Sequence, residues 1–132
     1  MLPSLTTLYR PVGQAEMDLI RAAEFRAFPP RLPERPIFYP VLTEDYATRI
    51  ARDWNTKDER SGFVGYVLRF KVRTAFLQAY DVHVVGSSDH REYWIPAADL
   101  NRMNANIEDT IKVVSEFRGA SALLKDGSRN DD

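Results

Sequence analysis

The chain has 132 residues, with 18 Lys and Arg against 19 Asp and Glu, and a formal net charge of −1. This balance disfavours a protein that holds DNA or RNA mainly by long-range electrostatic attraction. The chain has no cysteine and two histidines, which excludes disulfides, thiolate nucleophiles, zinc–thiolate sites and multi-histidine metal centres. A single domain is the expectation for this length.

The sequence predicts neither a membrane-spanning segment nor a secretory signal. No stretch approaches the roughly 20 apolar residues that a transmembrane helix needs. Residues Met1–Arg10 lack the apolar core of a signal peptide. We therefore expect a cytoplasmic protein.

The first half of the chain is predicted to contain two amphipathic helices joined by a stiff loop. Apolar side chains recur at helical spacing from Gln14 onward, and Glu16 suits the positive end of that helix. Four of the eight prolines lie in residues 28–36, which we expect to be an extended loop because proline cannot donate a backbone hydrogen bond. A second helix is expected after Thr43, a favourable N-cap residue that two acidic residues follow.

The second half is predicted to be rich in strands. Apolar side chains alternate with other residues over 64–72, which is the clearest two-residue period in the chain. The segments 82–85 and 92–95 flank a Gly-Ser-Ser-Asp loop and are expected to form a hairpin. Residues 1–117 are expected to form the domain, followed by a disordered tail over 118–132, whose last seven residues contain no apolar side chain.

Helices early and strands late in the chain indicate the α+β class rather than a regular alternation of strand and helix. In chain order we expect strand 5–10, helix 14–27, strand 37–39, helix 44–54, strand 64–72, a helical turn within 73–80, strands 82–85 and 92–95, helix 97–106 and strand 111–117.

Glu92 is the most informative candidate for chemistry, because it opens the aromatic segment Glu92–Tyr93–Trp94–Ile95. A carboxyl group beside aromatic rings is a candidate catalytic or ribose-binding group. The alternative is an exposed glutamate at a strand end, paired with Arg91 or Arg69. The sequence contains no phosphate-binding glycine loop and no GxSxG serine-hydrolase motif.

Arginines and one tyrosine are further binding candidates. Arg10 ends the first predicted strand and is either a bidentate phosphate ligand or a surface arginine with a packed stem. Tyr39 offers a flat ring for stacking or is a core aromatic residue. Arg31 and Arg35 in the proline-rich loop either line an anion site or are solvated. His83, with strand residues on both sides, is expected to be structural.

Several segments together resemble the ADP-ribosyltransferase fold over about residues 8–117. They are Leu8–Tyr9–Arg10, Phe38–Tyr39 followed by the predicted helix, and the Glu92 segment. The chain looks particularly like a group of small bacterial proteins that carry LYRPVG, RAFPPRLP, IFYPVL, ARDWN and EYWIP segments, some of them labelled as ADP-ribosylation proteins.

The resemblance implies a split β-sheet with flanking helices and a cleft that binds NAD as substrate. Arg10 matches the first-strand residue that contacts the NAD phosphate or ribose, and Tyr39 matches the position beside nicotinamide. Tyr46 is a further stacking candidate. Glu92 matches the late-strand catalytic glutamate, which stabilises the oxocarbenium-like cation formed when the nicotinamide–ribose bond breaks.

The implied activity is transfer of ADP-ribose to an unknown protein or nucleic-acid acceptor, or to water as an NAD glycohydrolase; a toxin is one plausible role. His90 stands two residues before Glu92, where members that modify arginine usually have an acid, so arginine is not the expected acceptor. Two alternatives keep the fold: a non-enzymatic interaction module, and an RNA 2′-phosphotransferase, which the balanced charge disfavours. A glycohydrolase that removes ADP-ribose fits poorly because no DDxD-like metal-binding cluster is present.

Overall fold

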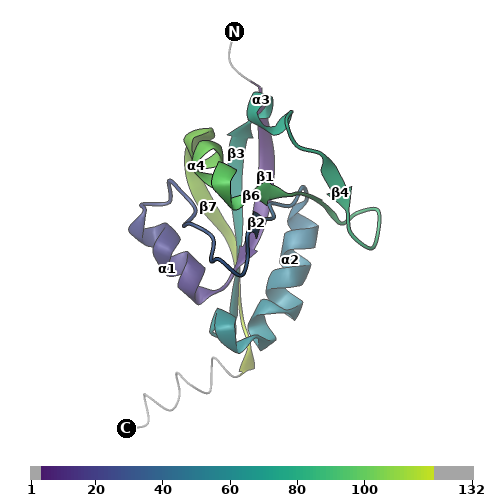
Figure 1. Cartoon of the computed structure of the whole chain (residues 1–132). Coiled ribbons are helices and arrows are strands. Elements are labelled where there is room, and N and C mark those ends of the chain that lie inside the picture. Colours follow the sequence, from purple (N-terminus) through teal and green to yellow (C-terminus); the bar gives the residue numbers. More distant parts are fainter. Residues whose placement is uncertain (1–3, 121–132) are drawn as a thin grey trace.

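The structure, a computed structural model, describes residues 4–120 and is mixed α+β, as the sequence predicts. Its three longest strands form the centre, with helices on both sides (Figure 1). No helix within residues 4–120 has the length and apolar character required to cross a membrane. The elements are β1 (Leu5–Val12), α1 (Gln14–Ala22), β2 (Ile37–Phe38), α2 (Glu44–Asp53), β3 (Val64–Arg73), α3 (Thr74–Leu77), β4 (Val82–Val84), β5 (Arg91–Tyr93), β6 (Ile95–Pro96), α4 (Leu100–Ala105) and β7 (Ile107–Arg118), with short 3-10 turns at Asn55–Lys57, Glu59–Ser61 and Ala97–Asp99.

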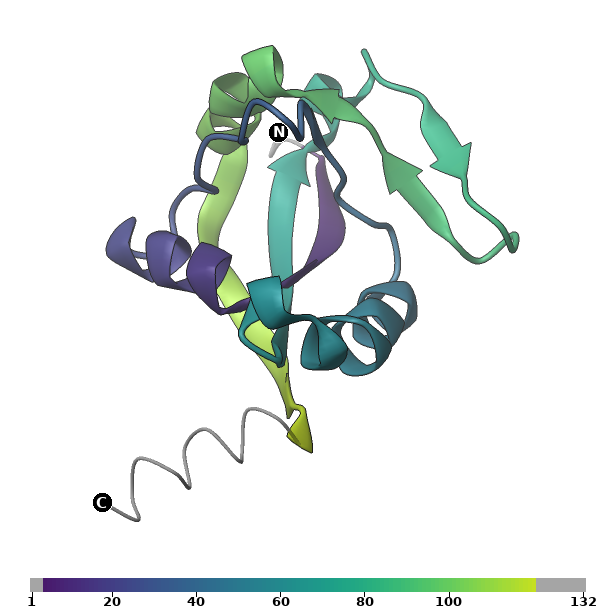
Figure 2. The same cartoon turned by 60° about the horizontal axis from the view of Figure 1, so that its bottom comes forward.

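Strands β1, β3 and β7 form an antiparallel sheet in that spatial order, while β2 pairs with β6 and β4 pairs with β5. Val41 connects the hairpin to the central sheet. Its backbone exchanges hydrogen bonds of 2.8 and 2.9 Å with Tyr9 of β1, and it also forms a β-bridge with Glu92 of β5. The β4–β5 hairpin therefore continues from the edge of the central sheet and projects away from the body (Figure 2).

Residues 37–41 run antiparallel to residues 92–96 in a single register. Ile37 pairs with Pro96, Phe38 pairs with Ile95, and Val41 pairs with Glu92. Because side chains alternate between the two faces of a sheet, this register places residues 39, 41, 92 and 94 on one face. Phe38 and Ile95 point to the other face, into the main core.

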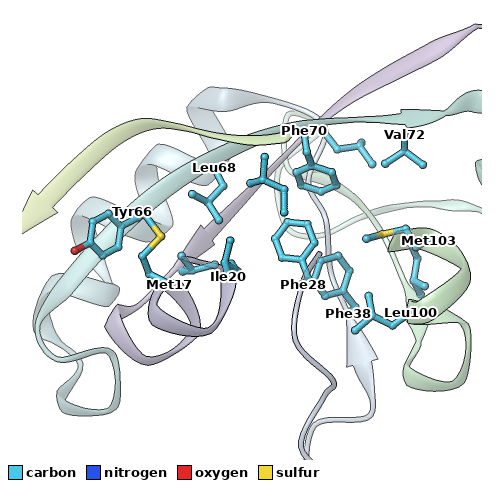
Figure 3. Packing of buried hydrophobic residues seen from close by; sticks show 14 of the residues in the cluster. Met17, Ile20, Phe28, Phe38, Tyr66, Leu68, Phe70, Val72, Leu100 and Met103 are labelled. Carbon is cyan, nitrogen blue, oxygen red and sulfur yellow. The ribbon is translucent and has the colours of Figure 1, made fainter. Parts of the chain in front are cut away.

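The two faces of the central sheet pack against different helices. The side chains at even positions of β3, from Tyr66 to Val72, join the core cluster that includes Met17 and Ile20 of α1. Figure 3 shows these side chains with Phe28, Phe38, Leu100 and Met103. On the opposite face, Val67 packs with Val41 and with two alanines of α2, Ala47 and Ala51.

The proline-rich segment is an ordered loop that is fixed at its two ends. Asn104 of α4 accepts a hydrogen bond from the Phe28 backbone N–H and donates one to the Phe28 carbonyl, both of 3.0 Å. The Phe28 ring packs against Phe38 and Phe70 at centroid distances of 4.9 and 4.8 Å. At the other end, Arg31 Nε donates to the Ile37 carbonyl at 3.1 Å. These contacts anchor the loop opposite α1.

Some element boundaries differ from the sequence prediction. Helix α1 ends at Ala22 rather than at residue 27, because Glu24 and Phe25 have positive φ angles of 58° and 60° that a right-handed helix does not accommodate. Strand β7 starts at Ile107, four residues before the predicted start, and continues through Arg118. Residues 121–132 of the predicted disordered tail lie outside the described part of the chain.

Candidate functional site

Glu92 is buried between β5 and helix α2, with 8% of its surface exposed. Two neutral side chains donate hydrogen bonds to its carboxylate. The Tyr46 hydroxyl donates to Oε2 at 3.1 Å, and Trp94 Nε1 donates to Oε1 at 2.8 Å. Each oxygen therefore has one fixed donor, which sets the orientation of the carboxylate and stabilises its charge.

The phenol of Tyr46 is held in its neutral form. Burial raises its pKa most, and the charge of Glu92 and the hydrogen bond to it raise the pKa further, to about 12. Tyr46 therefore remains a proton donor to Glu92 throughout the physiological range. Its place on α2 follows from Thr43, whose Oγ1 accepts from the Tyr46 N–H at 3.2 Å and caps the helix as predicted.

Aromatic rings surround this carboxylate. His83 stacks on Trp94 at a centroid distance of 3.7 Å, and His90 stacks on Tyr46 at 4.4 Å, both pairs within 5° of parallel. Tyr39 meets Trp94 edge-on at 6.1 Å. Trp94 and Tyr39 are 43% and 40% exposed, so the site presents partly exposed aromatic rings next to a buried carboxylate. A planar ligand with a positively charged ring suits such a surface.

Arg10 lies in a different environment. Its Nε and Nη2 donate to the two carboxylate oxygens of Glu16 at 2.6 and 2.9 Å, and its guanidinium lies 4.4 Å from the centre of the Phe38 ring. Arg31 approaches the same carboxylate at 3.9 Å. Burial raises the pKa of Glu16, but the charge and hydrogen bonds of Arg10 and the charge of Arg31 outweigh it, so the net pKa is lowered.

The register of the strands places Arg10 and Glu92 on opposite faces of the sheet. Directly paired residues point to the same face, and Tyr9 pairs with Val41, which pairs with Glu92. Arg10 follows Tyr9 in the strand and therefore points the other way, towards α1. The structure thus brings Glu92, Tyr46 and Tyr39 together through Trp94, but it does not place Arg10 among them.

A cavity of about 400 Å³ lies beside Arg10, between α1 and the proline-rich loop. Arg31 connects it with the aromatic site, because its Nε donates to the carbonyl of Ile37, two residues before Tyr39. The pKa of Arg31 is lowered, chiefly by burial and then by the charge of Arg10, while the acidic groups of Glu16 and Tyr39 act in the opposite direction. The residues around the cavity include Arg10, Gly13, Ala15, Glu16, Leu19, Pro29, Pro30, Arg31, Arg35, Asp58, Arg60 and Ser61.

Sequence reasoning missed two of these groups, Trp94 and Glu16, as partners of the predicted site residues. Tyr46, a predicted stacking residue, is in addition a hydrogen-bond donor to Glu92. Trp94 was detectable, because residues two apart in a strand share a face. The pairing of Glu16 with Arg10 had no local signal. Within residues 4–120, no group of three or more acidic or histidine side chains is arranged to hold a metal ion.

Comparison of the chain with protein-family models, with curated proteins and with solved structures found no match.

Proposed function

We propose that the chain is an NAD-cleaving protein of the ADP-ribosyltransferase type, with Glu92 as its catalytic carboxylate. The observation that carries this proposal is a buried carboxylate with one neutral donor on each oxygen, directly beside exposed aromatic rings. A pyridinium ring next to a ribose has the matching chemistry, because the ring stacks while the sugar carbon develops positive charge.

The proposed reaction breaks the bond between nicotinamide and C1′ of ribose. The bonding electron pair leaves with nicotinamide, which becomes neutral, and the ribosyl group passes through an oxocarbenium-like state that the Glu92 carboxylate stabilises. An acceptor nucleophile or water then adds to C1′ and loses a proton. Tyr46 and Trp94 keep the carboxylate pointed in one direction during this change, so little reorganisation is needed.

The remainder of NAD would extend from Tyr39 past Arg31 to the cavity that contains Arg10. Support comes from Arg31, which contacts both Ile37 and the carboxylate of Glu16. The strand segment 37–41 supports the split-sheet interpretation, because it bridges β1 only at Val41 and pairs with β6 beyond that point. In this arrangement, Tyr39 and Trp94 contact nicotinamide and Arg10 contacts the diphosphate.

Nicotinamide release from NAD by the wild type and by Glu92→Gln tests the proposal. Glutamine keeps the shape of the side chain but removes the charge, so release should fall by about 10²- to 10³-fold. Glu116→Gln is the matched control, since it makes the same change of side chain at an exposed position on β7. Glu116 forms an exposed ion pair of 2.8 Å with Arg118. Equal release by wild type and Glu92→Gln would contradict the catalytic role.

A thermal-shift measurement with NAD separates this proposal from the main alternative, a non-enzymatic interaction module. Both the wild type and Glu92→Gln should be stabilised by NAD, because the substitution leaves the aromatic rings and arginines in place. Stabilisation without nicotinamide release, in the presence of cell extract as a source of acceptors, would favour a nucleotide-binding module. The absence of both stabilisation by NAD and nicotinamide release would favour a module that binds another partner.

A further inference from the structure

The cavity beside α1 contains more positive than negative charge close to its buried wall. The carboxylate of Glu16 lies between the guanidinium groups of Arg10 and Arg31, at 2.6 and 3.9 Å. The side chains of the two arginines are 10% and 13% exposed, whereas that of Glu16 is 22% exposed. One carboxylate therefore balances two largely buried cations, and one positive charge remains uncompensated within this group.

The beginning of helix α1 adds to this positive field. Gly13, Ala15 and Glu16 line the cavity, so the positive end of the helix dipole faces it. Gly13 is the N-cap residue and provides no side-chain cap. A larger residue does not fit there, because a Cβ on Gly13 would lie 2.5 Å from the Cα of Ser61. Gly13 is therefore packed tightly against Ser61, and Glu16 is the acidic residue in the first turn of the helix.

We infer that Glu16 is an internal counter-ion that a phosphate group of the ligand displaces, and that this exchange makes the cavity select multiply charged phosphates over singly charged anions. The inference builds on the proposed function, because the phosphate would belong to the diphosphate of NAD. In the free protein, the Glu16 carboxylate occupies the hydrogen-bond donors of the Arg10 guanidinium. The phosphate binds Arg10 only when it replaces this carboxylate.

The selectivity follows from the charges that are exchanged. A singly charged anion that displaces Glu16 replaces one negative charge with another, so the surplus positive charge stays unbalanced while a bidentate ion pair has been broken. A diphosphate brings at least two negative charges and neutralises Arg10 and Arg31 together. Glu16 is the most exposed of the three side chains, so its carboxylate has a path to water when it leaves.

Isothermal titration with pyrophosphate and with acetate, at fixed ionic strength and without NAD, tests this inference. The wild type should bind pyrophosphate and not acetate. Glu16→Gln should bind pyrophosphate about tenfold more tightly, since the competing charge is gone, and should begin to bind acetate. Asp18→Asn is the matched control on the same helix, where Asp18 is exposed and pairs loosely with Arg21 at 4.0 Å, and it should behave as the wild type.

Glu16→Asp provides a second variant that retains the charge, in case Glu16→Gln does not fold. The shorter side chain should lose the bidentate contact with Arg10 and therefore also bind pyrophosphate more tightly. Weaker binding in both variants would overturn the inference, because Glu16 would then orient Arg10 for the ligand rather than compete with it. Absence of pyrophosphate binding in the wild type and in both variants would overturn it as well. Because no NAD is cleaved in these titrations, their outcome is independent of whether Glu92 is catalytic.

Discussion

Tyr46 and Glu92 are 46 positions apart in the sequence and share a hydrogen bond of 3.1 Å. The bond joins the first turn of α2 to strand β5, so the capped start of a helix fixes one oxygen of a buried carboxylate. Trp94 fixes the other oxygen from two residues along the chain. The candidate catalytic group is therefore oriented by one long-range and one local contact.

The ionisation of Tyr46 reports on its contact with Glu92. We expect the phenol to titrate at about 12 in the wild type, compared with an ordinary value of 10.0. In Glu92→Gln the pKa of Tyr46 should move down, but burial, the largest cause of the shift, should keep it above the ordinary value. The chemical shift of the ¹³Cζ atom of Tyr46, followed by NMR against pH, measures this change.

The same ionisation predicts the stability of the protein in alkali. The pKa of Tyr46 is raised in the folded state, so its stabilising contribution is complete below pH 10 and is lost as the pH rises through about 12. The free energy of unfolding, measured by denaturation between pH 8 and 11.5, should therefore fall less steeply with pH in Tyr46→Phe than in the wild type. Tyr39→Phe, at an exposed ring, is the control, and an equal slope in Tyr46→Phe and the wild type would contradict the raised pKa of Tyr46.

Removing the Trp94 donor should lower turnover more than binding. In Trp94→Phe an aromatic ring still stacks on His83, but the Nε1 donor to Glu92 is lost. We expect kcat for nicotinamide release to fall about tenfold, which corresponds to the loss of one hydrogen bond to a charged group, with KM for NAD changed by less than about threefold.

Trp54→Phe is the matched control for that substitution, because the chain has two tryptophans and Trp54 is 73% exposed on another part of the surface. This variant should have wild-type kinetics. A rise in KM at unchanged kcat in Trp94→Phe would show that Trp94 binds the substrate but does not position Glu92.

The Arg10–Glu16 pair should stabilise the protein above about pH 4.5 and lose its effect in acid. The pKa of Glu16 is lowered from 4.5, so its contribution is complete above that value and is lost as the pH falls through the folded-state pKa. At pH 7, Glu16→Gln should lower the free energy of unfolding by about 1 to 3 kcal/mol. Urea denaturation at several pH values should show that this difference shrinks towards pH 3.

Asp18→Asn is the control for Glu16→Gln. It should change the free energy of unfolding by less than about 0.5 kcal/mol at every pH, because Asp18 and its ion-pair partner Arg21 are both exposed. A difference between Glu16→Gln and the wild type that stays constant down to pH 3 would mean that the charge of Glu16 does not contribute.

Gly65 is required where helix α2 crosses β3. A Cβ at this position would collide with the backbone carbonyl of Ala51. Gly65→Ala should therefore lower the free energy of unfolding by about 2 kcal/mol or more, measured by urea denaturation. Gly86→Ala is the matched control, because its Cβ would meet nothing closer than His90 at 4.0 Å and the cost is limited to its positive φ of 77°, about 1 kcal/mol. Equal losses in the two variants would show that α2 moves away from β3 at little cost.

Local features of the sequence were sufficient for much of the fold. The two-residue period over 64–72 corresponds to β3, and Thr43 caps α2 through its own side chain. The β4–β5 hairpin lies where the loop residues from Gly86 onward predicted it. These features depend on contacts between residues a few positions apart, which backbone preferences and side-chain periodicity encode directly.

The sequence by itself therefore determined the α+β class and singled out Glu92 as an unusual carboxylate. The tertiary structure decided which residues contact that carboxylate, and it placed Arg10 on the other face of the sheet with Glu16. Val41 illustrates the reason: its two β-bridges, one to Tyr9 and one to Glu92, set the relative register of three segments distant in sequence. Such a register depends on the lengths and shapes of the intervening loops and on packing of the whole core, so no local pattern around Glu92 or Arg10 contains it.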